Sequence, residues 1–394
     1  MTNEMPGVVL PQAALDAANS DNGRSIGMFE KRGWAGSLPR KFTLATAMAG
    51  LLWAGAASAQ ETVVMGQGED ISKMCGDKPT IVGLADGFGG NTWRKEVVAE
   101  LKDEAAKCKN ITQIIHTDAM GDPAKANSDI NSLVAQGVNV LILFPDFGEA
   151  QLPALRAAVE AGVVVIPYNA TLVGEQGVDF SYNVYQDHNA NARKWAGWLD
   201  KNVGSGSLLY FSGPAGNSHS TAVDAAIRKA LSPYPDLKFL EGGYIATNWN
   251  PAETQKATAG VIAKYGTVDA VITDLGTVTM SILRTFEQAK LKLPAVVSLA
   301  SNNELNCYWL DLKKQSKAFP YITLDGTTLT VRHALRRGMA EYQGTENKEP
   351  LAMEALIYAD SFGGIDPKCD LELPPDADLS GMLTPDQLKA VFAQ

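Results

Sequence analysis

The sequence predicts an α/β protein of two lobes, each built on a doubly wound parallel sheet, with a hinge joining them. Short apolar runs rich in β-branched residues alternate with amphipathic stretches of helical spacing, as a parallel sheet covered on both faces requires. This alternation occurs twice along 394 residues. At about 150 residues per domain, that length suits two hydrophobic cores.

The first alternating segment opens with an apolar strand at 80–84 and a helix at 93–107, where Val97, Leu101 and Ala105 recur at helical spacing. Further strands are expected at 111–115, 138–144 and 163–167, and helices at 123–136 and 151–161. We assign 60–170 to an N-terminal lobe. We expect 304–342 to return to this lobe through a strand at 321–324 and a helix at 330–342.

The second segment repeats the design, and we assign 171–303 to a C-terminal lobe. Its expected strands are 207–211, 238–244, 270–273 and 295–299, and its expected helices are 190–202, 221–231, 251–265 and 278–289. Three crossovers, near 168–189, 299–306 and 323–328, form the predicted hinge. Residues 343–394 are expected to be a tail that packs on the lobes, ending in a short helix that Thr384 caps and Pro385 opens.

The N-terminus has the features of an exported protein. Arg40 and Lys41 precede an uncharged apolar run that ends in Ala57-Ser58-Ala59, a small-x-small pattern that signal peptidase accepts. We therefore predict that 1–59 are an upstream extension and a signal peptide, and that the mature chain is periplasmic. A membrane anchor is the alternative, but the run of about 16 residues is shorter than the roughly 20 that span a bilayer.

The four cysteines all follow this cleavage site. An even number in an oxidising compartment indicates two disulfides, and pairing within each half of the chain favours Cys75–Cys108 and Cys307–Cys369. Free buried thiols are the alternative. The spacings are too long for a CxxC redox or zinc site.

Charge and motifs exclude several classes of function. The net charge of −10 disfavours a nucleic-acid partner. The sequence contains no GxSxG, GxxxxGK[ST], HExxH or GxGxxG, and its four histidines lack metal-ligand spacing. We therefore predict no enzyme, no cofactor and no metal. A carboxylate pair assembled from distant loops would be the exception.

Polar and aromatic residues gather in the loops that follow the predicted strands, where ligands bind in doubly wound sheets. Amides, carboxylates and a guanidinium bond to adjacent hydroxyls, while indole rings cover C–H faces, a combination that suits a carbohydrate. An Asn or Asp at such a position can instead cap a helix. The predicted ligand-binding residues are Asp86, Phe88, Asn91, Trp93, Arg94, Asp146, Asn169, Asn217, His219, Trp249, Asp274 and Asn302.

Loop motifs over about residues 79–342 resemble those of periplasmic sugar-binding proteins of the ribose-binding type, the type I solute receptors of ABC importers. Asn91-Thr92-Trp93-Arg94 stands where that family has an Asn-Pro-Phe-Phe-like segment, and the strand end at 165–170 resembles Val-Ile-Thr-Leu-Asp-Arg. The resemblance implies that Asn91 is a polar contact and that Trp93 and Trp249 are stacking rings. Asn169 stands where the family has an acid.

The resemblance implies a monomeric receptor that closes by its hinge on a small sugar, a pentose, polyol or related monosaccharide other than ribose. Its partners would be an ABC transporter permease or a chemoreceptor. Two alternatives stay open, a periplasmic enzyme acting on a sugar and a receptor for a furanose-like signalling molecule. Repressors of the lactose-repressor type share the core, but the predicted signal peptide contradicts that function.

Overall fold

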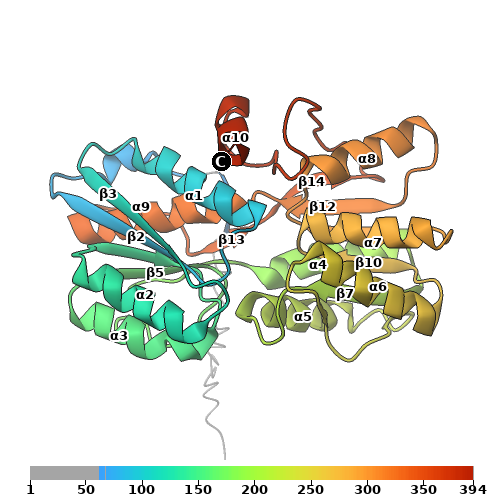
Figure 1. The fold of residues 1–394 in the computed structure, drawn as a ribbon, viewed down its shortest axis with the longest axis horizontal. Helices are drawn as coiled ribbons and strands as arrows, with labels where there is room; N and C mark the ends of the chain where they lie inside the picture. The colour runs from blue at the N-terminus through green and yellow to red at the C-terminus, as the bar shows by residue number, and fades with distance from the viewer. Residues whose placement is uncertain (1–61, 67, 394) are drawn as a thin grey trace, which may run out of the picture. The chain divides into compact units, whose positions relative to one another are not determined.

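The structure of the protein is a computed structural model that describes residues 62–66 and 68–393. The predicted extension and signal peptide, 1–59, lie outside the described residues. Within the described part of the chain, no helix has both the length and the apolar character needed to cross a membrane. Two α/β lobes make up this part, as the alternating pattern predicts (Figure 1).

The sheet of the first lobe has seven strands in the order β1-β13-β6-β5-β4-β2-β3, and all neighbouring pairs are parallel. Helices α2 and α3 cover one face, and α1 and α9 cover the other (Figure 1). The strands are β1 Thr62–Val64, β2 Thr80–Asp86, β3 Ile111–Asp118, β4 Val140–Leu143, β5 Val164–Asn169, β6 Val184–Gln186 and β13 Ala352–Glu354. The helices are α1 Thr92–Ala105, α2 Pro123–Ala135, α3 Leu152–Glu160 and α9 Thr330–Gln343.

The sheet of the second lobe has the order β14-β12-β11-β10-β7-β8, with β9 also paired to β7. Only the β12–β14 pair is antiparallel among the described strands. The strands are β7 Gly206–Ser212, β8 Leu237–Phe239, β9 Ile245–Ala246, β10 Ala270–Thr273, β11 Ala295–Leu299, β12 Tyr321–Asp325 and β14 Leu356–Asp360. The helices are α4 His188–Asn202, α5 Ser218–Leu231, α6 Pro251–Tyr265, α7 Gly276–Gln288 and α8 Asn303–Lys314.

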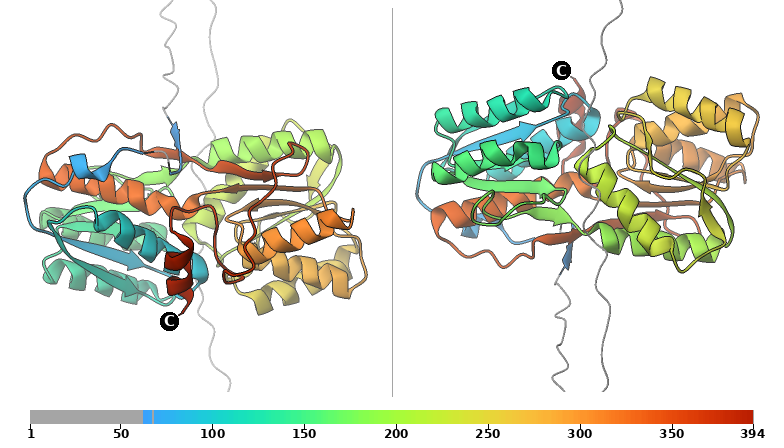
Figure 2. Two further views of the ribbon diagram at one scale, coloured as in Figure 1. Left: turned by 90° about the horizontal axis from the view of Figure 1, so that it is seen from above. Right: turned by 90° about the horizontal axis from the view of Figure 1, so that it is seen from below.

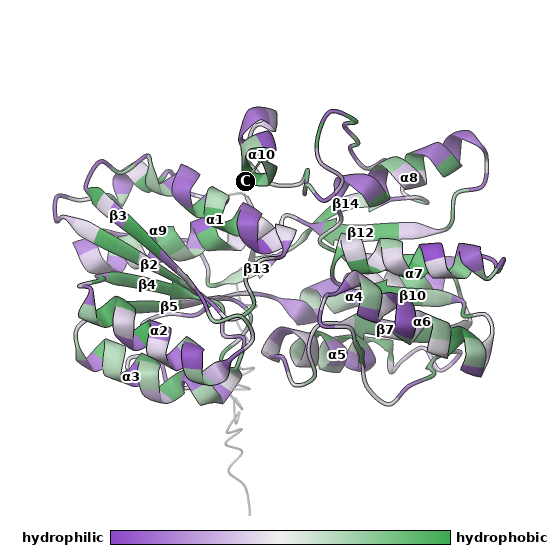
Figure 3. Ribbon diagram, viewed as in Figure 1, coloured by the Kyte–Doolittle hydropathy of each residue, from purple (hydrophilic) through white to green (hydrophobic). Residues whose placement is uncertain are grey.

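The central strands carry apolar residues on both faces because helices cover both faces of each sheet. In β7, Leu208 and Tyr210 join the core beneath α4 and α5, while Leu209 and Phe211 join the core beneath α6 and α7. Successive side chains of a strand point to opposite faces, so one apolar run serves two cores. Figure 3 shows the same distribution, with hydrophobic strands inside and hydrophilic residues on the outer helix surfaces.

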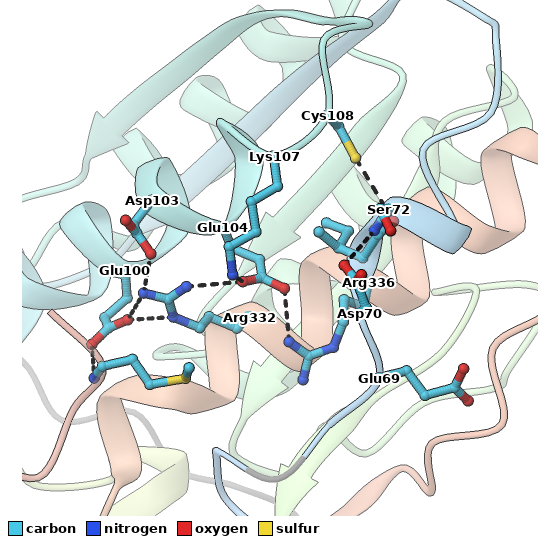
Figure 4. A network of polar contacts seen from close by, with 12 residues as sticks. Glu69, Asp70, Ser72, Glu100, Asp103, Glu104, Lys107, Cys108, Arg332 and Arg336 are labelled. Atoms are coloured by element: carbon cyan, nitrogen blue, oxygen red, sulfur yellow. Dashed lines mark hydrogen bonds and ion pairs between the residues drawn. The ribbon is translucent and has the colours of Figure 1, made fainter.

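Helices α1 and α9 are joined by a buried network of charges, which Figure 4 shows from close by. Arg332 of α9 donates to Asp103 and Glu104 of α1 at 2.7 and 2.8 Å and also to Glu100. Arg336 donates to Glu104 at 2.9 Å. Removing one partner of such a pair leaves an uncompensated buried charge. Moving α1 away from α9 would separate these charges, so the network fixes the position of α1. This helix carries two of the predicted site residues.

The sheet order corrects the expected lobe boundaries. The strand at 321–324 does not return to the first lobe, because β12 pairs with β11 and β14 in the second sheet. Of the segment 304–342, only α9 returns to the first lobe, and it packs on β4 and β5. The chain leaves the first lobe after β6 and not at residue 170, since β6 pairs with β5.

Three crossovers join the lobes, and two of them were predicted. The chain passes from β6 to α4 near Asp187 and from β12 to α9 through the short helix η3, Thr327–Leu329. The expected crossover at 299–306 is wrong, because β11 and β12 are neighbours in one sheet and α8 begins at Asn303. The third crossover is instead Ala355, between β13 and β14.

The strand expected at 238–244 is only partly present, because β8 covers its first two residues and β9 begins just after it, at Ile245. Gly242 and Gly243 lie between them, and glycine weakens a strand interior.

The tail packs on both lobes, as expected, and adds β13 to the first sheet and β14 to the second. Its last helix, α10 Pro385–Phe392, begins with a capping box at Thr384, and Gln387 donates to Asp103 of α1 at 2.7 Å. Figure 2 shows the tail running beside the second lobe before α10 lies against α1.

Both predicted disulfides are present. Cys75 pairs with Cys108, and Cys307 of α8 pairs with Cys369 of the tail. The second bond fixes the tail to the second lobe, where the backbone N–H of Asn303 also donates to the Ala377 carbonyl at 2.8 Å.

Candidate functional site

A cavity lies between the lobes, at the carboxyl ends of strands from both sheets. The first lobe lines it with Asn91, Trp93, Arg94, Phe144, Asn169 and Gln186. The second lobe lines it with His219, Trp249, Asp274, Leu275, Leu299 and Ala300, and Thr327 comes from a crossover. Seven of the twelve predicted residues are therefore brought together, as the topology of doubly wound sheets predicts.

Arg94 is held in the cavity wall by two carboxylates. Its Nη1 donates to Asp86 Oδ1 at 2.7 Å, and its Nη2 donates to both oxygens of Asp146 at 2.8 and 3.1 Å. The guanidinium also lies 3.9 Å from the centroid of the Phe144 ring. All three charged side chains are buried, so the fork is rigid and its charge is compensated within the protein.

The protonation of this group follows from burial and charge. Burial lowers the pKa of the Arg94 guanidinium, but the Asp146 and Asp86 carboxylates outweigh it and raise that pKa above its ordinary value. Burial raises the pKa of Asp146 to about 6, although Arg94 opposes the shift.

Asp86 and Asp146 therefore lie behind Arg94 and do not line the cavity, in contrast to their expected place as ligand contacts. Asp86 Oδ2 also forms a hydrogen bond with His116 Nε2 at 2.9 Å. The Gly87 N–H donates to Asp146 Oδ2 at 2.9 Å. Their oxygens are used to hold the arginine.

Asn169 is fixed from two sides at the end of β5. Its Oδ1 accepts from Gln186 Nε2 at 2.6 Å and from Thr330 Oγ1 at 3.0 Å. Its φ is 70°, a left-handed conformation that Asn tolerates better than most residues. Because Oδ1 is occupied, the N–H groups of Asn169 Nδ2 remain as the donors of this side chain.

The two tryptophans both use their indole N–H groups inside the protein. Trp93 Nε1 donates to Thr327 Oγ1 at 2.8 Å, and Trp249 Nε1 donates to Asp274 Oδ1 at 3.0 Å. The surfaces that remain for a ligand are apolar ring faces and edges. Trp249 and Ala300 have φ values of 49° and 53°, and such strained conformations concentrate at functional sites.

Asp274 accepts from several donors of its own lobe. Tyr210 OH donates at 3.2 Å, and Ser212 Oγ donates as well. Burial raises the pKa of Asp274 to about 6, while the hydrogen bonds from Ser212, Trp249 and Tyr210 lower it.

His219 lies beside Asp274 with a neutral imidazole. Burial lowers its pKa well below the ordinary value, and the nearby His188 and Arg94 lower it further. Its Nε2 is 3.7 Å from Asp274 Oδ2, and its Nδ1 finds no hydrogen-bond partner among the described residues. His188, whose ring centroid is 5.0 Å away, has a pKa lowered to about 4 by burial.

Contacts at the rim hold the lobes together around the cavity. Asn217 Nδ2 of α5 donates to Asp146 Oδ1 at 3.3 Å, and Ser218 Oγ donates to the Pro145 carbonyl at 2.6 Å. The rings of Phe88 and Trp249 meet edge to face with centroids 6.4 Å apart. These contacts cross from one lobe to the other, so the lobes are closed in this structure.

Three predicted residues therefore lie away from the cavity wall. Asn217 caps α5 by accepting from the Ser220 N–H at 3.2 Å, and Phe88 packs on Phe147 at the rim. Asn302 caps α8 by accepting from the Leu305 N–H at 3.0 Å. For both asparagines, helix capping is the role that the structure shows.

Six lining residues were not predicted. Most are apolar or small residues at strand ends, which in sequence look like core residues, and Gln186 lies in a strand of only three residues. Their one shared signal is a position at the end of a strand, within two residues of that end, or in a crossover. They are Phe144, Gln186, Leu275, Leu299, Ala300 and Thr327.

No cluster of three or more His, Cys, Asp or Glu side chains suited to a metal ion occurs in the part of the chain that the structure describes.

Residues 82–318 match the family model described as "Periplasmic binding protein domain". The chain belongs to this family. The fold class and the resemblance stated from the sequence are thereby confirmed.

Two proteins are similar in sequence to part of this chain. A xylitol-binding protein of Mycolicibacterium smegmatis is 26% identical over 189 residues, 48% of this chain and 52% of the relative. The ABC transporter periplasmic-binding protein YphF of Escherichia coli is 36% identical over 83 residues, 21% of this chain and 25% of the relative. The matched segments thus span about half, or less, of each relative.

Solved structures of periplasmic binding proteins share the fold. The Caulobacter myo-inositol binding protein, bound to myo-inositol, has a TM-score of 0.63 at 19% identity and covers 73% of this chain and 95% of its own. The binding component of the arabinose ABC transporter from Shewanella sp. ANA-3, bound to α- and β-L-arabinofuranose, has a TM-score of 0.61 at 18% identity. That match covers 70% of this chain and 89% of the other.

Proposed function

We propose that this protein is a periplasmic receptor that captures one small, neutral sugar or polyol between its lobes and delivers it to an ABC importer. The observation that carries the proposal is the interlobe cavity, where an arginine neutralised by two carboxylates meets two tryptophan rings and fixed amides. The described relatives, a xylitol-binding protein and an ABC transporter periplasmic-binding protein, support the same class of ligand and partner.

The charges of the cavity favour a neutral ligand. Asp86 and Asp146 neutralise the charge of Arg94. The guanidinium therefore offers directed N–H groups but little net attraction for an anion. Asp274 adds a further acid on the opposite side. A sugar acid or a phosphate would meet this acid without a free cation among the lining residues.

Hydroxyl groups suit the amides of this wall. Asn91 Oδ1 accepts from the backbone N–H of Arg94 at 2.9 Å. Asn169 Oδ1 accepts from Gln186 and Thr330. Each amide therefore keeps its Nδ2 as a donor for an oxygen of the ligand. The faces of Trp93 and Trp249 provide the apolar surface that C–H groups of a sugar pack against.

Capture takes place by closure of the hinge. Ligand contacts from both lobes stabilise only the closed form, and closure removes water from the hydrogen bonds. Moving the lobes from 1:99 to 99:1 in favour of closure requires about 5.5 kcal/mol of differential binding. The closed form then docks, as a monomer, on the importer's permease or on a chemoreceptor.

A thermal-shift screen of the exported, processed protein tests this function. The panel contains xylitol and other pentitols, myo-inositol, pentoses, hexoses, sugar acids and amino acids. A ligand at about a thousand times its Kd should stabilise the fold by about 4 kcal/mol and should be recovered chemically unchanged. A response only to acids or amino acids, or conversion of the sugar to a product, contradicts the proposal.

A further inference from the structure

The second-lobe wall of the cavity is apolar where Leu275, Leu299 and Ala300 line it. Leu275 follows β10, Leu299 ends β11, and Ala300 comes next in the chain. Leu299 and Ala300 are buried, and Leu275 is 9% exposed. The wall is thus formed by aliphatic side chains at the ends of two neighbouring strands.

Most backbone groups of this wall are already bonded, including the Leu275 carbonyl, which accepts from the Thr279 N–H at 3.0 Å. The Ala300 N–H donates to the Leu324 carbonyl at 3.2 Å, and the Ala300 carbonyl accepts from the Gly276 N–H at 2.8 Å. The Leu299 carbonyl accepts from Ser298 Oγ at 3.3 Å. These groups are used in the fold of the second lobe and leave little capacity for a hydroxyl of the ligand.

The polar side chains next to the wall are occupied in the same way. Trp249 Nε1, Tyr210 OH and Ser212 Oγ all donate to Asp274. His219 Nδ1 has no hydrogen-bond partner among the described residues. The His219 ring lies against Phe144 of the first lobe, with ring centroids 6.4 Å apart, so this imidazole borders the first-lobe side of the cavity and not the aliphatic wall.

From this asymmetry, and resting on the proposed function, we propose that the ligand is a sugar or polyol with an apolar end. A terminal methyl, deoxy or thioether group would face Leu275, Leu299 and Ala300, while the hydroxyls face Arg94 and Asn169. A buried hydroxyl without a partner loses its bonds to water, whereas a methyl group gains from leaving water.

Calorimetric titration with matched pairs of sugars measures this preference. The pairs differ only in one terminal hydroxyl and keep the same ring size or remain acyclic: L-galactose and L-fucose, L-mannose and L-rhamnose, xylitol and 1-deoxy-D-xylitol. We expect the terminal-deoxy member of the bound pair to have a Kd about tenfold lower, which is about 1.4 kcal/mol. 2-Deoxy-L-galactose, which lacks an internal hydroxyl, should bind less tightly than L-fucose, which lacks the terminal one.

The outcomes separate the inference from the function on which it rests. In one outcome, the fully hydroxylated member binds as tightly as the deoxy member, or more tightly, in every pair that binds. That result overturns the proposal of an apolar end but leaves the receptor function standing. Absence of binding by every member of the pairs and by every sugar and polyol of the thermal-shift panel overturns both.

A polar substitution in the wall should reduce the preference for the deoxy member. Leu275→Asn offers a hydroxyl a partner, so we expect the tenfold ratio to fall to about twofold or less. Leu275→Met keeps the wall apolar and should keep the tenfold ratio of Kd values. This second variant can still be measured if Leu275→Asn fails to fold. Leu293→Asn is the matched control, because Leu293 lies beyond the opposite end of β11 and does not line the cavity. Equal ratios in Leu275→Asn and Leu293→Asn, with both variants folded, contradict the proposal.

Discussion

The two lobes line the same cavity with different chemistry, although both place it at the carboxyl ends of parallel strands. The first lobe contributes the Arg94 fork and the fixed amides of Asn91 and Asn169. The second contributes Trp249, the buried carboxylate of Asp274, a neutral imidazole and an aliphatic wall. Because the sheets share one design, the difference comes from the side chains placed on the fold.

The contrast indicates a division of labour. Directed donors in the first lobe fix the orientation of hydroxyl groups, since hydrogen bonds depend on angle. An apolar wall in the second lobe selects by size and by the absence of polar groups, since burial of apolar surface is not directional. The four predictions that follow test this division, from the largest expected effect to the smallest.

Arg94→Met should cause the largest loss. It leaves Asp86 and Asp146 buried without their cation, and removing one partner of a buried ion pair costs about 3–5 kcal/mol in the free energy of unfolding. Urea unfolding measures it. Lys95→Met is the matched control, since Lys95 is exposed one position along the same helix. A loss below about 1 kcal/mol in Arg94→Met would show that the fork does not organise the first-lobe half.

Trp249→Ala should weaken binding of the compound that gives the largest thermal shift by about a hundredfold, about 2.7 kcal/mol, because a half-buried aromatic ring of the cavity wall is lost. Titration calorimetry gives the ratio of Kd values. Phe362→Ala removes an exposed ring of the same lobe and should change the Kd less than twofold. Similar effects in the two variants would place the ligand away from Trp249.

Asp274→Asn should change how stability depends on pH. The pKa of Asp274 is raised to about 6 in the folded protein, so between about pH 4 and pH 6 the folded state binds more protons than the unfolded state. This group therefore lowers the free energy of unfolding as pH rises through that window, by about 2 kcal/mol. The variant should lose that part of the decline in thermal or urea unfolding across pH 4 to 7.

Asp236→Asn, at an exposed position of the same lobe, is the control for that profile. If both variants keep the wild-type pH dependence, the buried acid of the second-lobe half is not perturbed as described.

Asn217→Ala should have the smallest effect and a distinctive one. It removes the cap of α5, worth about 1 kcal/mol, together with the bond to Asp146 across the rim. Asn250→Ala removes the cap of α6 in the same lobe. Both should lower the free energy of unfolding similarly, but only Asn217→Ala should weaken ligand binding, by about threefold. Equal affinities would show that the rim bond does not contribute to closure.

The sequence predicted the parts of the fold and site that depend on local pattern. Apolar strands and helical spacing located most elements, and the loops that follow the strands contain seven of the residues that line the cavity. Pairing within each half of the chain predicted both disulfides, Cys75–Cys108 and Cys307–Cys369.

The remaining features depend on partners that are distant along the chain. The apolar residues of β12 predict a strand but not the sheet that it joins, which is decided by pairing with β11. Nothing local shows that Arg94 reaches Asp146, 52 positions away, or that Leu275 and Leu299 face a cavity and not a core.

Small-angle X-ray scattering of the exported protein, with and without the compound that gives the largest thermal shift, tests the central claim most directly. Capture between the lobes predicts that the radius of gyration falls when the ligand binds, and that Trp249→Ala shifts this change to higher ligand concentration. A ligand that binds, by calorimetry, while the radius of gyration stays the same and Trp249→Ala has no effect would contradict capture in this cavity.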